Sequence, residues 1–339
     1  MIRPLTALTV CGILLGCSGT TSTGAPPPPP RQGLPTAPPT VSAETPAPEK
    51  KECSCRLKLK PSPASAEQPK PISGDLPKGP FDLERRSACT TPVCKLDGFV
   101  PDAAFLQTTH EGKPAQGAVW LETIADGSAV ELPSADEIDA VALVLEGSAE
   151  FGAGEAKKTA KSEPLGTWQA LKVPGSGYFI RARGGRTSVL MGVTARTGTL
   201  ADAVKVAQQK KKPASTSRAF EVGDLNTKTK LTWGGGAYHA RIAFGTEDTN
   251  ASLTLIQAGA NGTIAENSHD KEWEHIAILR GSGDMLLGNS KYPVRDGAMF
   301  QVPPGVVHGF QGGGQELAAV LVFSPSGPEG RFFQLGSGK

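Results

Sequence analysis

An internal repeat constrains the fold of this chain more than any other feature of its sequence. The stretch "AVALVLEGSAEF" at 140–151 parallels "HIAILRGSGDML" at 275–286. Further along, "TWQALKVPGSGYF" at 167–179 parallels "GAMFQVPPGVVHG" at 297–309, with a Pro-Gly turn at the same place in both. Self-similarity of this kind predicts two copies of one domain.

Each copy consists of short β-rich runs separated by Gly, Pro and Asn turns. This pattern predicts all-β sandwiches or barrels, with one domain over residues 96–200 and the other over 216–335. Between them, "TLADAVKVAQQKKKP" has a Thr cap, an Asp three residues later and a terminal Pro. It predicts a helical linker over 201–215.

The chain before the first copy reads as a signal peptide and a tether. Residues 1–17, "MIRPLTALTVCGILLGC", have one Arg and an apolar core too short to span a bilayer, which predicts export. "LLGC" resembles the lipobox of bacterial lipoproteins, in which Cys17 would carry the lipid; ordinary cleavage and an uncleaved anchor stay open as alternatives. The proline-rich residues 18–86 are expected to be a disordered tether.

By the same resemblance, Ser18 after the cysteine favours the outer membrane of a Gram-negative cell envelope. A membrane partner through the lipid anchor is therefore expected. The formal net charge is +2, with acids and bases interspersed, so the sequence lacks the clustered basic face of a nucleic-acid-binding protein.

Four further cysteines suit an oxidising compartment: Cys53, Cys55, Cys89 and Cys94. The first two are too close for an easy bond with each other, so the expected bridges join that pair to Cys89 and Cys94. A four-thiolate zinc site is the alternative, although the spacings fit zinc ribbons poorly.

The second copy carries two motifs with chemistry. "NSHDKEWEHIAILRG" supplies Asn267, His269, Glu274 and Gly281, and "GAMFQVPPGVVH" supplies a glycine, a Pro-x-Gly turn and His308. In spacing, the two stretches resemble the two motifs of the cupins, a family of small double-stranded β-helix (jelly-roll) domains. The resemblance implies two cupin domains, of which the first, at 96–200, is degenerate.

The resemblance also implies a metal site. Two imidazoles and a carboxylate, from His269, His308 and Glu274, form a set that suits Fe, with Mn, Zn or Ni also tolerated. Most metal-binding cupins have histidine where this chain has Asn267, and an amide oxygen is a weaker ligand. Asn267→His is therefore expected to tighten binding. The alternative is a hydrogen-bonded polar cluster or a metal-free pocket.

Other polar residues are given ordinary roles. Alternation along the strand sends His275 to the face opposite Glu274, where a surface position is expected. His110 and His239 are expected to be plain loop or strand residues. Arg331, in "FSPSGPEGRFFQL", is expected either to meet a ligand carboxylate at the barrel mouth or to pair with Glu329 or a backbone carbonyl.

The first copy has no histidine at the corresponding positions. Pro133, Ala135 and Ala140 stand where the second copy has Asn267, His269 and Glu274, and Tyr178 faces His308; a slip of one residue would bring in Asp139. The first domain is therefore expected to be metal-free, with packing as its role.

Three functions remain open at this point. The sequence favours an exported, lipid-anchored protein with two cupin domains that binds a small polar ligand and a divalent metal. A metal-dependent enzyme of the dioxygenase, decarboxylase or isomerase type is the second reading. A structural lipoprotein with a vestigial pocket is the third, since the fold hosts many unrelated functions. The substrate and the oligomeric state are not predicted.

Overall fold

The computed structural model describes eight stretches of the chain: residues 68–84, 86–95, 114–132, 135–158, 161–175, 177–209, 220–245 and 251–336. The signal peptide, Cys17, Cys53, Cys55, His110 and Pro133 lie outside these residues, so the predictions for them stay predictions. Within the described residues, no helix has the length and apolar character needed to cross a membrane.

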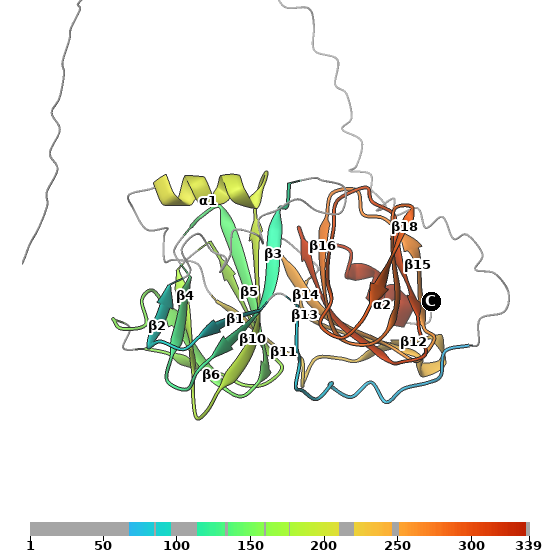
Figure 1. Ribbon diagram of the computed structural model, residues 1–339, viewed down its shortest axis with the longest axis horizontal. Coiled ribbons are helices and arrows are strands. Elements are labelled where there is room, and N and C mark those ends of the chain that lie inside the picture. Colours follow the sequence, from blue (N-terminus) through green and yellow to red (C-terminus); the bar gives the residue numbers. More distant parts are fainter. Residues whose placement is uncertain are drawn as a thin grey trace, which may run out of the picture. The chain divides into compact units, whose positions relative to one another are not determined.

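The described residues form two β-barrels, which confirms the all-β, double jelly-roll prediction (Figure 1). In the first barrel, one sheet contains, in spatial order, β1 (Arg86–Cys89), β3 (Gly117–Ile124), β10 (Thr187–Ala195), β5 (Ile138–Glu146), β8 (Gln169–Pro174) and β11 (Glu221–Asp224). The facing sheet contains β2 (Val93–Lys95), β4 (Ala129–Leu132), β9 (Tyr178–Ala182), β6 (Ala149–Ala153) and β7 (Glu163–Leu165).

The second barrel repeats this topology. Its larger sheet contains β12 (Leu231–Trp233), β13 (Tyr238–Phe244), β14 (Ser252–Ala258), β21 (Leu317–Ser324), β16 (Trp273–Arg280) and β19 (Met299–Val302). Its smaller sheet contains β15 (Thr263–Asn267), β20 (His308–Gly312), β17 (Gly283–Leu287) and β18 (Ser290–Val294). The order β14-β21-β16-β19 matches β3-β10-β5-β8 of the first barrel, so the sequence repeat is a repeat of strand pairing.

Within the part of the chain that the structure describes, three helical elements accompany the barrels. Helix α1 (Leu200–Gln209) follows the first barrel, and η2 (Gly234–Gly236) lies between β12 and β13. Helix α1 begins as the sequence predicts: the Thr199 hydroxyl accepts a hydrogen bond from the Asp202 amide at 3.1 Å, which satisfies one of the unpaired amides of the first turn. The short α2 (Gly330–Gly336) ends the described chain and buries Phe332 in the second barrel.

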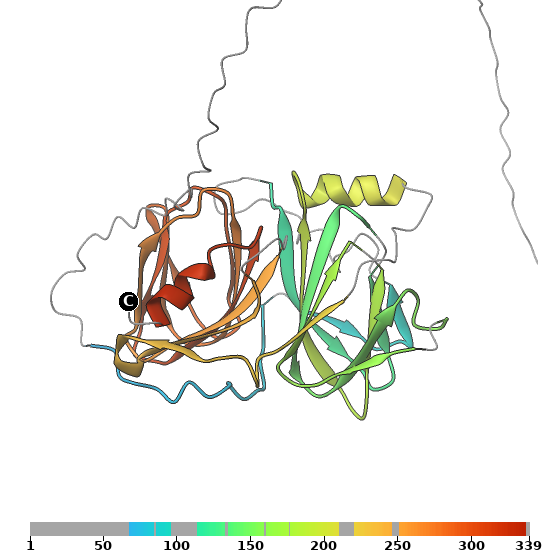
Figure 2. The same cartoon turned by 180° about the vertical axis from the view of Figure 1, so that it is seen from behind.

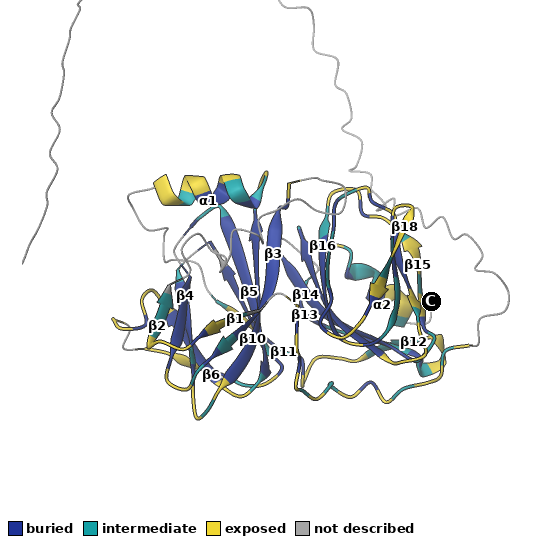
Figure 3. Cartoon of the chain, in the orientation of Figure 1, coloured by how far each residue is buried: buried dark blue, intermediate teal, exposed yellow. Residues whose placement is uncertain are grey.

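An apolar seam joins the barrels. One face of the first barrel's larger sheet, with Leu121, Leu143 and Leu190, packs in one cluster with Leu255 and Leu279 of the second. The strands that carry these residues are buried along most of their length (Figure 3). Burying both sheet faces in this way removes apolar surface from water that a single barrel would expose.

The seam corrects the prediction for His275. This residue does face away from Glu274, but its side chain is 1 % exposed and lies against the first barrel rather than at the surface. A Cβ atom on Gly117 of β3 would come within 2.7 Å of the His275 Nε2 atom, which shows how closely the two sheets approach there. His239 is also buried, on β13.

Two boundaries differ from the sequence prediction. Residues 221–224, expected in the second domain, form β11 and pair with β8 of the first barrel. Residues 86–95, expected in the tether or before the first domain, form β1 and β2, which pair in parallel with β3 and β4. The end of the expected tether is thus part of the folded protein.

The disulfide prediction is wrong in its pairing. Cys89 and Cys94 are bonded to each other, not to Cys53 and Cys55. Their Cα atoms are 5.7 Å apart, a separation normal for a disulfide, across the bend at residues 91–92 where the chain passes from β1 in the larger sheet to β2 in the facing sheet.

Candidate metal centre

The two motifs of the second copy meet through backbone contacts. Strand β15 pairs with β20 so that Asn267 lies opposite His308. In the Pro-Gly turn that precedes β20, Gly305 has φ +79, a left-handed conformation that glycine adopts without strain. The Gly305 amide donates a 2.7 Å hydrogen bond to the carbonyl of His269. One turn therefore fixes His269 and His308 relative to each other.

Glu274 is supplied by the central strand β16. Its side chain shares the inward face with Ile276 and Ile278, whereas Ala277 and Leu279 on the other face belong to the seam. Because both faces of β16 are buried, a slip of one residue would place the carboxylate in the apolar seam. The strand can therefore hold Glu274 in only one register.

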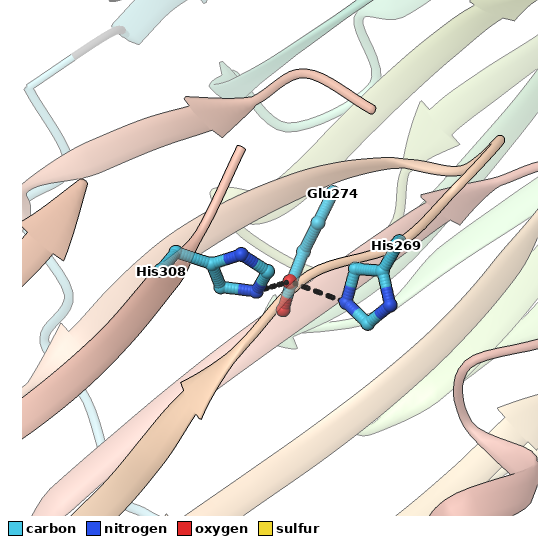
Figure 4. A group of neighbouring side chains, drawn as sticks. All are labelled: His269, Glu274 and His308. Atoms are coloured by element: carbon cyan, nitrogen blue, oxygen red, sulfur yellow. Dashed lines mark hydrogen bonds and ion pairs between the residues drawn. The ribbon is translucent and has the colours of Figure 1, made fainter. Parts of the chain in front are cut away.

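The three side chains converge inside the second barrel (Figure 4). The His269 Nε2 atom lies 3.3 Å from Glu274 Oε2, and His308 Nε2 lies 2.8 Å from the same oxygen. One ligand-type atom from each residue lies within 4.8 Å of those of the other two. All three residues are buried, at 3 to 6 % exposure.

The tautomer of His308 follows from its surroundings. Its Nδ1 atom lies 3.0 Å from the carbonyl of Val306, so Nδ1 carries the hydrogen and donates it. In a neutral imidazole, the lone pair is then on Nε2. That atom is buried and makes no aligned hydrogen bond with any described residue, although the Glu274 carboxylate is close to it.

The carboxyl of Glu274 is held in its ionised form. Burial alone would raise its pKa, but a protonated His308, the contacts with His269 and His308, and the charge of Arg331 outweigh burial. The net effect holds the pKa of Glu274 well below its usual range. The barrel interior therefore contains an anionic oxygen facing two imidazole nitrogens.

Asn267 lies beside this group, but its side-chain amide is hydrogen-bonded to other residues. Its Oδ1 atom accepts a 2.6 Å hydrogen bond from Arg331 Nη1, and its Nδ2 atom donates to the carbonyls of Ala265 and His308 at 3.0 and 3.3 Å. The donor on one side and two acceptors on the other fix the orientation of the amide. The sequence predicts a ligand carboxylate, Glu329 or a backbone carbonyl as the partner of Arg331, and the structure shows Asn267 as a partner.

A small cavity adjoins the group. Its volume is about 30 Å³, and its wall includes Asn267, Glu274, His308 and Arg331. The remaining wall is almost entirely apolar, with Ile256, Ile264, Ile276, Ile278, Met285, Gly309, Phe310, Leu317, Ala319 and Leu321. Typical ligand pockets have several hundred Å³, so this cavity holds no more than an ion or a few small atoms as it stands.

The corresponding place in the first barrel is apolar. Ala135, Ala140 and Tyr178 belong to its hydrophobic core, and Tyr178 is fully buried. Asp139 faces away from this core and pairs with Arg196 at 2.7 Å. The Tyr178 hydroxyl has no hydrogen-bond partner among the described residues, and burial raises the pKa of this phenol.

Comparisons with known proteins agree with the fold. Residues 252–324 match the family model described as a cupin domain. No curated protein matches the sequence. Among solved structures, oxalate decarboxylase from Lactobacillus farciminis, in its formate complex, has a TM-score of 0.50 at 13% identity, covering 65% of this chain and 80% of that chain. One barrel alone could not supply this coverage, so the likeness supports a two-barrel architecture.

Two further solved structures resemble the chain at lower scores. A mutant of Bacillus subtilis oxalate decarboxylase has a TM-score of 0.49 at 12% identity, covering 63% of this chain and 70% of that chain. Procruciferin, an 11S globulin from Brassica napus, has a TM-score of 0.47 at 10% identity, covering 62% of this chain and 77% of that chain.

The unpartnered hydroxyl in the first barrel gives a testable prediction. Tyr178→Phe removes a buried polar atom that gains nothing in the folded state, so the free energy of unfolding should rise by about 1 kcal/mol. Urea unfolding followed by circular dichroism measures this. Tyr238→Phe is the matched control, because its hydroxyl accepts from the amide of Thr263 and donates to its carbonyl, and this variant should be destabilised. A less stable Tyr178→Phe would contradict the assignment.

Proposed function

We propose that the chain is a cupin protein and that it binds a divalent first-row metal ion in its second barrel through His269, Glu274 and His308. The observation that carries the proposal is the meeting of three electron-pair donors in a buried place. A neutral His308 would turn its Nε2 lone pair toward the Glu274 carboxylate at 2.8 Å, which is unfavourable unless a positive charge lies between them. A proton would supply that charge to one pair of atoms, whereas a metal ion would supply it to all three residues.

The donor set supports this choice. Two ligands of one first-row ion are about 3 to 4 Å apart, since each bond is about 2.1 Å, and the three donor atoms lie within 4.8 Å of one another. The Nδ1–H group of His308 donates to a backbone carbonyl, as is usual for metal-bound imidazoles. Two imidazoles and a carboxylate suit Fe, Mn, Zn or Ni. When bound, such an ion would supply a Lewis-acidic centre with open coordination positions.

In this proposal Asn267 is not a metal ligand; it positions neighbouring residues through hydrogen bonds. Its amide holds the Arg331 guanidinium at the cavity wall and also bonds the backbone of His308. The ligand set would then be two histidines and one glutamate, with a fixed cation beside them. A small polar ligand would have to be compact, because a sugar ring exceeds the cavity of about 30 Å³.

The metal proposal is tested by titrating the metal-free, full-length protein with Mn²⁺ and Zn²⁺ in a calorimeter. We expect His308→Ala to weaken binding by roughly 100-fold or more, because two ligands remain. Affinity should also fall at low pH, because protons compete with the metal for the imidazole nitrogens. His239→Gln is the matched control: it removes a buried histidine outside the site and retains a side-chain N–H donor.

Two outcomes would count against the metal proposal. Equal metal affinity in wild type and His308→Ala would place binding elsewhere, and no affinity in the folded wild type would leave a hydrogen-bonded polar cluster. Asn267→His is informative in addition. We expect it to tighten binding, but only if the new imidazole turns from Arg331 toward the other ligands.

We further propose that the protein is exported and lipid-anchored through Cys17, with the outer membrane as its location and the proline-rich segment as its tether. The support is in the sequence alone: the apolar core of residues 1–17 ends in Gly-Cys. An oxidising compartment also suits the disulfide between Cys89 and Cys94.

Mass spectrometry of the native protein tests the anchor. The mature chain should begin at Cys17 with acyl chains attached, and Cys17→Ser should move the protein from the membrane fraction to the soluble fraction. An unmodified Cys17 in the native protein would refute the anchor without refuting export.

A metal-dependent enzyme acting on a small carboxylate is the second candidate, and Arg331 is the observation that favours it. Its guanidinium lies at the cavity wall, where it lowers the pKa of Glu274 and would meet an anionic substrate. The metal-loaded protein should then convert oxalate and one proton to carbon dioxide and formate, and Arg331→Gln should raise KM at least 10-fold. Metal binding without any turnover would leave the binding protein as the function.

A further inference from the structure

The segment of residues 68–84, called the strap here, runs along the second barrel and into the seam. It contains no strand or helix, yet it is ordered against the barrels (Figures 1 and 2, blue). Its sequence, "QPKPISGDLPKGPFDLE", has four prolines. Because proline fixes φ and lacks an N–H, such a segment is preorganised in an extended form and is rich in backbone acceptors relative to donors.

The second barrel contacts the strap mainly through side-chain donors. Five side chains, called the donor row here, each donate to a main-chain carbonyl of the strap. The pairs are His239 Nε2 to Ile72 (3.0 Å), Lys230 Nζ to Ser73 (2.6 Å), Arg241 Nη1 to Gly74 (2.7 Å), Gln257 Nε2 to Asp75 (2.8 Å) and Arg280 Nη2 to Lys78.

These contacts recognise backbone rather than side-chain identity. Four of the acceptors are the consecutive carbonyls of residues 72–75, so the row follows the path of an extended chain. The tautomer of His239 agrees with its role as a donor, since its Nδ1 atom lies 2.9 Å from the Thr232 hydroxyl and accepts from it. Donor side chains that face carbonyls suit a proline-containing peptide better than an ordinary strand, which would also need partners for its N–H groups.

Apolar side chains anchor the other end of the strap. Phe81 and Leu83 are buried in the seam cluster with residues from both barrels. The Phe81 ring packs edge-on against Trp168 of the first barrel, with ring centroids 6.0 Å apart. The strap is thus held at one end by backbone recognition and at the other by apolar burial.

Gly74 marks the closest approach of strap and donor row. Its φ is +63, and a Cβ atom at this position would come within 2.4 Å of the His239 ring. Any larger residue at position 74 must therefore lift the strap from His239 as well as strain the backbone.

We propose that the donor row is a binding site for extended, proline-containing peptide and that residues 72–78 of the same chain occupy it in cis. The site is separate from the metal-type group of His269, Glu274 and His308, so the proposal does not depend on metal binding. Its occupant when the strap is released is the same segment of a second copy, because that segment has the carbonyl path that the row already fits.

The test uses full-length protein and a fluorescein-labelled peptide with the sequence of residues 68–84. Gly74→Val should release the strap, seen as faster trypsin cleavage after Lys78, and should bind the labelled peptide at least 10-fold more tightly than wild type, whose own strap competes at high effective concentration. Fluorescence anisotropy measures the binding. Gly127→Val is the matched control, because Gly127 has φ +72 and nothing within 4 Å of a built Cβ.

Donor and peptide variants complete the test. Arg241→Ala in the Gly74→Val background should abolish peptide binding, as should Lys230→Ala to a lesser degree, with circular dichroism to confirm the fold. A peptide with its four prolines changed to alanine should bind at least several-fold more weakly. Unchanged trypsin protection of Gly74→Val, no peptide binding by the released protein, or binding that survives loss of the donors would each overturn the proposal.

Discussion

The packing of two apolar sheet faces against each other is the constraint on which the rest of the structure depends. It requires β16 and β14 in the second barrel, and β3, β5 and β10 in the first, to be buried on both faces. Such strands cannot shift in register without moving apolar side chains out of one core and polar ones into another. The first barrel has Ala135, Ala140 and Tyr178 at the positions that correspond to the site. Its contribution to the site is the packing that fixes the register of β16 and so the position of Glu274.

The candidate site adds an electrostatic demand to this rigid frame. An ionised carboxylate and two imidazoles lie at 3 to 6 % exposure, next to a largely apolar cavity. An unpaired carboxylate in such surroundings is costly. A cation near Glu274 therefore stabilises the fold, in addition to any effect it has on a bound ligand. Arg331 supplies part of that charge, and Asn267 fixes its position. Asn267, at the position where the resemblance to cupins implied a histidine, thus holds the guanidinium of Arg331.

The repeat and its β-rich runs were enough to predict two all-β domains, because strand alternation and Pro-Gly turns are local properties. The jelly-roll fold and the three side chains that meet were implied by the resemblance to the cupin motifs. The rest depends on contacts between distant segments. Alternation gave the correct face for His275 but could not reveal that another barrel covers that face. The partner of Asn267 is 64 positions away on a different element. The pairing of Cys89 with Cys94 depends on a bend between two short strands that the sequence prediction left almost entirely outside the tether and the first domain. The strap was missed for the same reason, since its prolines predict extended chain but not what the chain lies against.

The strap is bound mainly through its backbone carbonyls, and this determines which of its positions tolerate substitution. Contacts made to carbonyls place little demand on the side chains that project from the same residues, so Lys78 should tolerate substitution, whereas the Ser73 hydroxyl accepts from the Asp75 amide at 3.1 Å and the Asp75 charge acts on Arg241. The positions with little freedom are Gly74, where any added atom meets His239, and the buried Phe81. The strap has the composition of a linker. A mutational scan would nevertheless find a few positions that tolerate no substitution, as in a recognition motif.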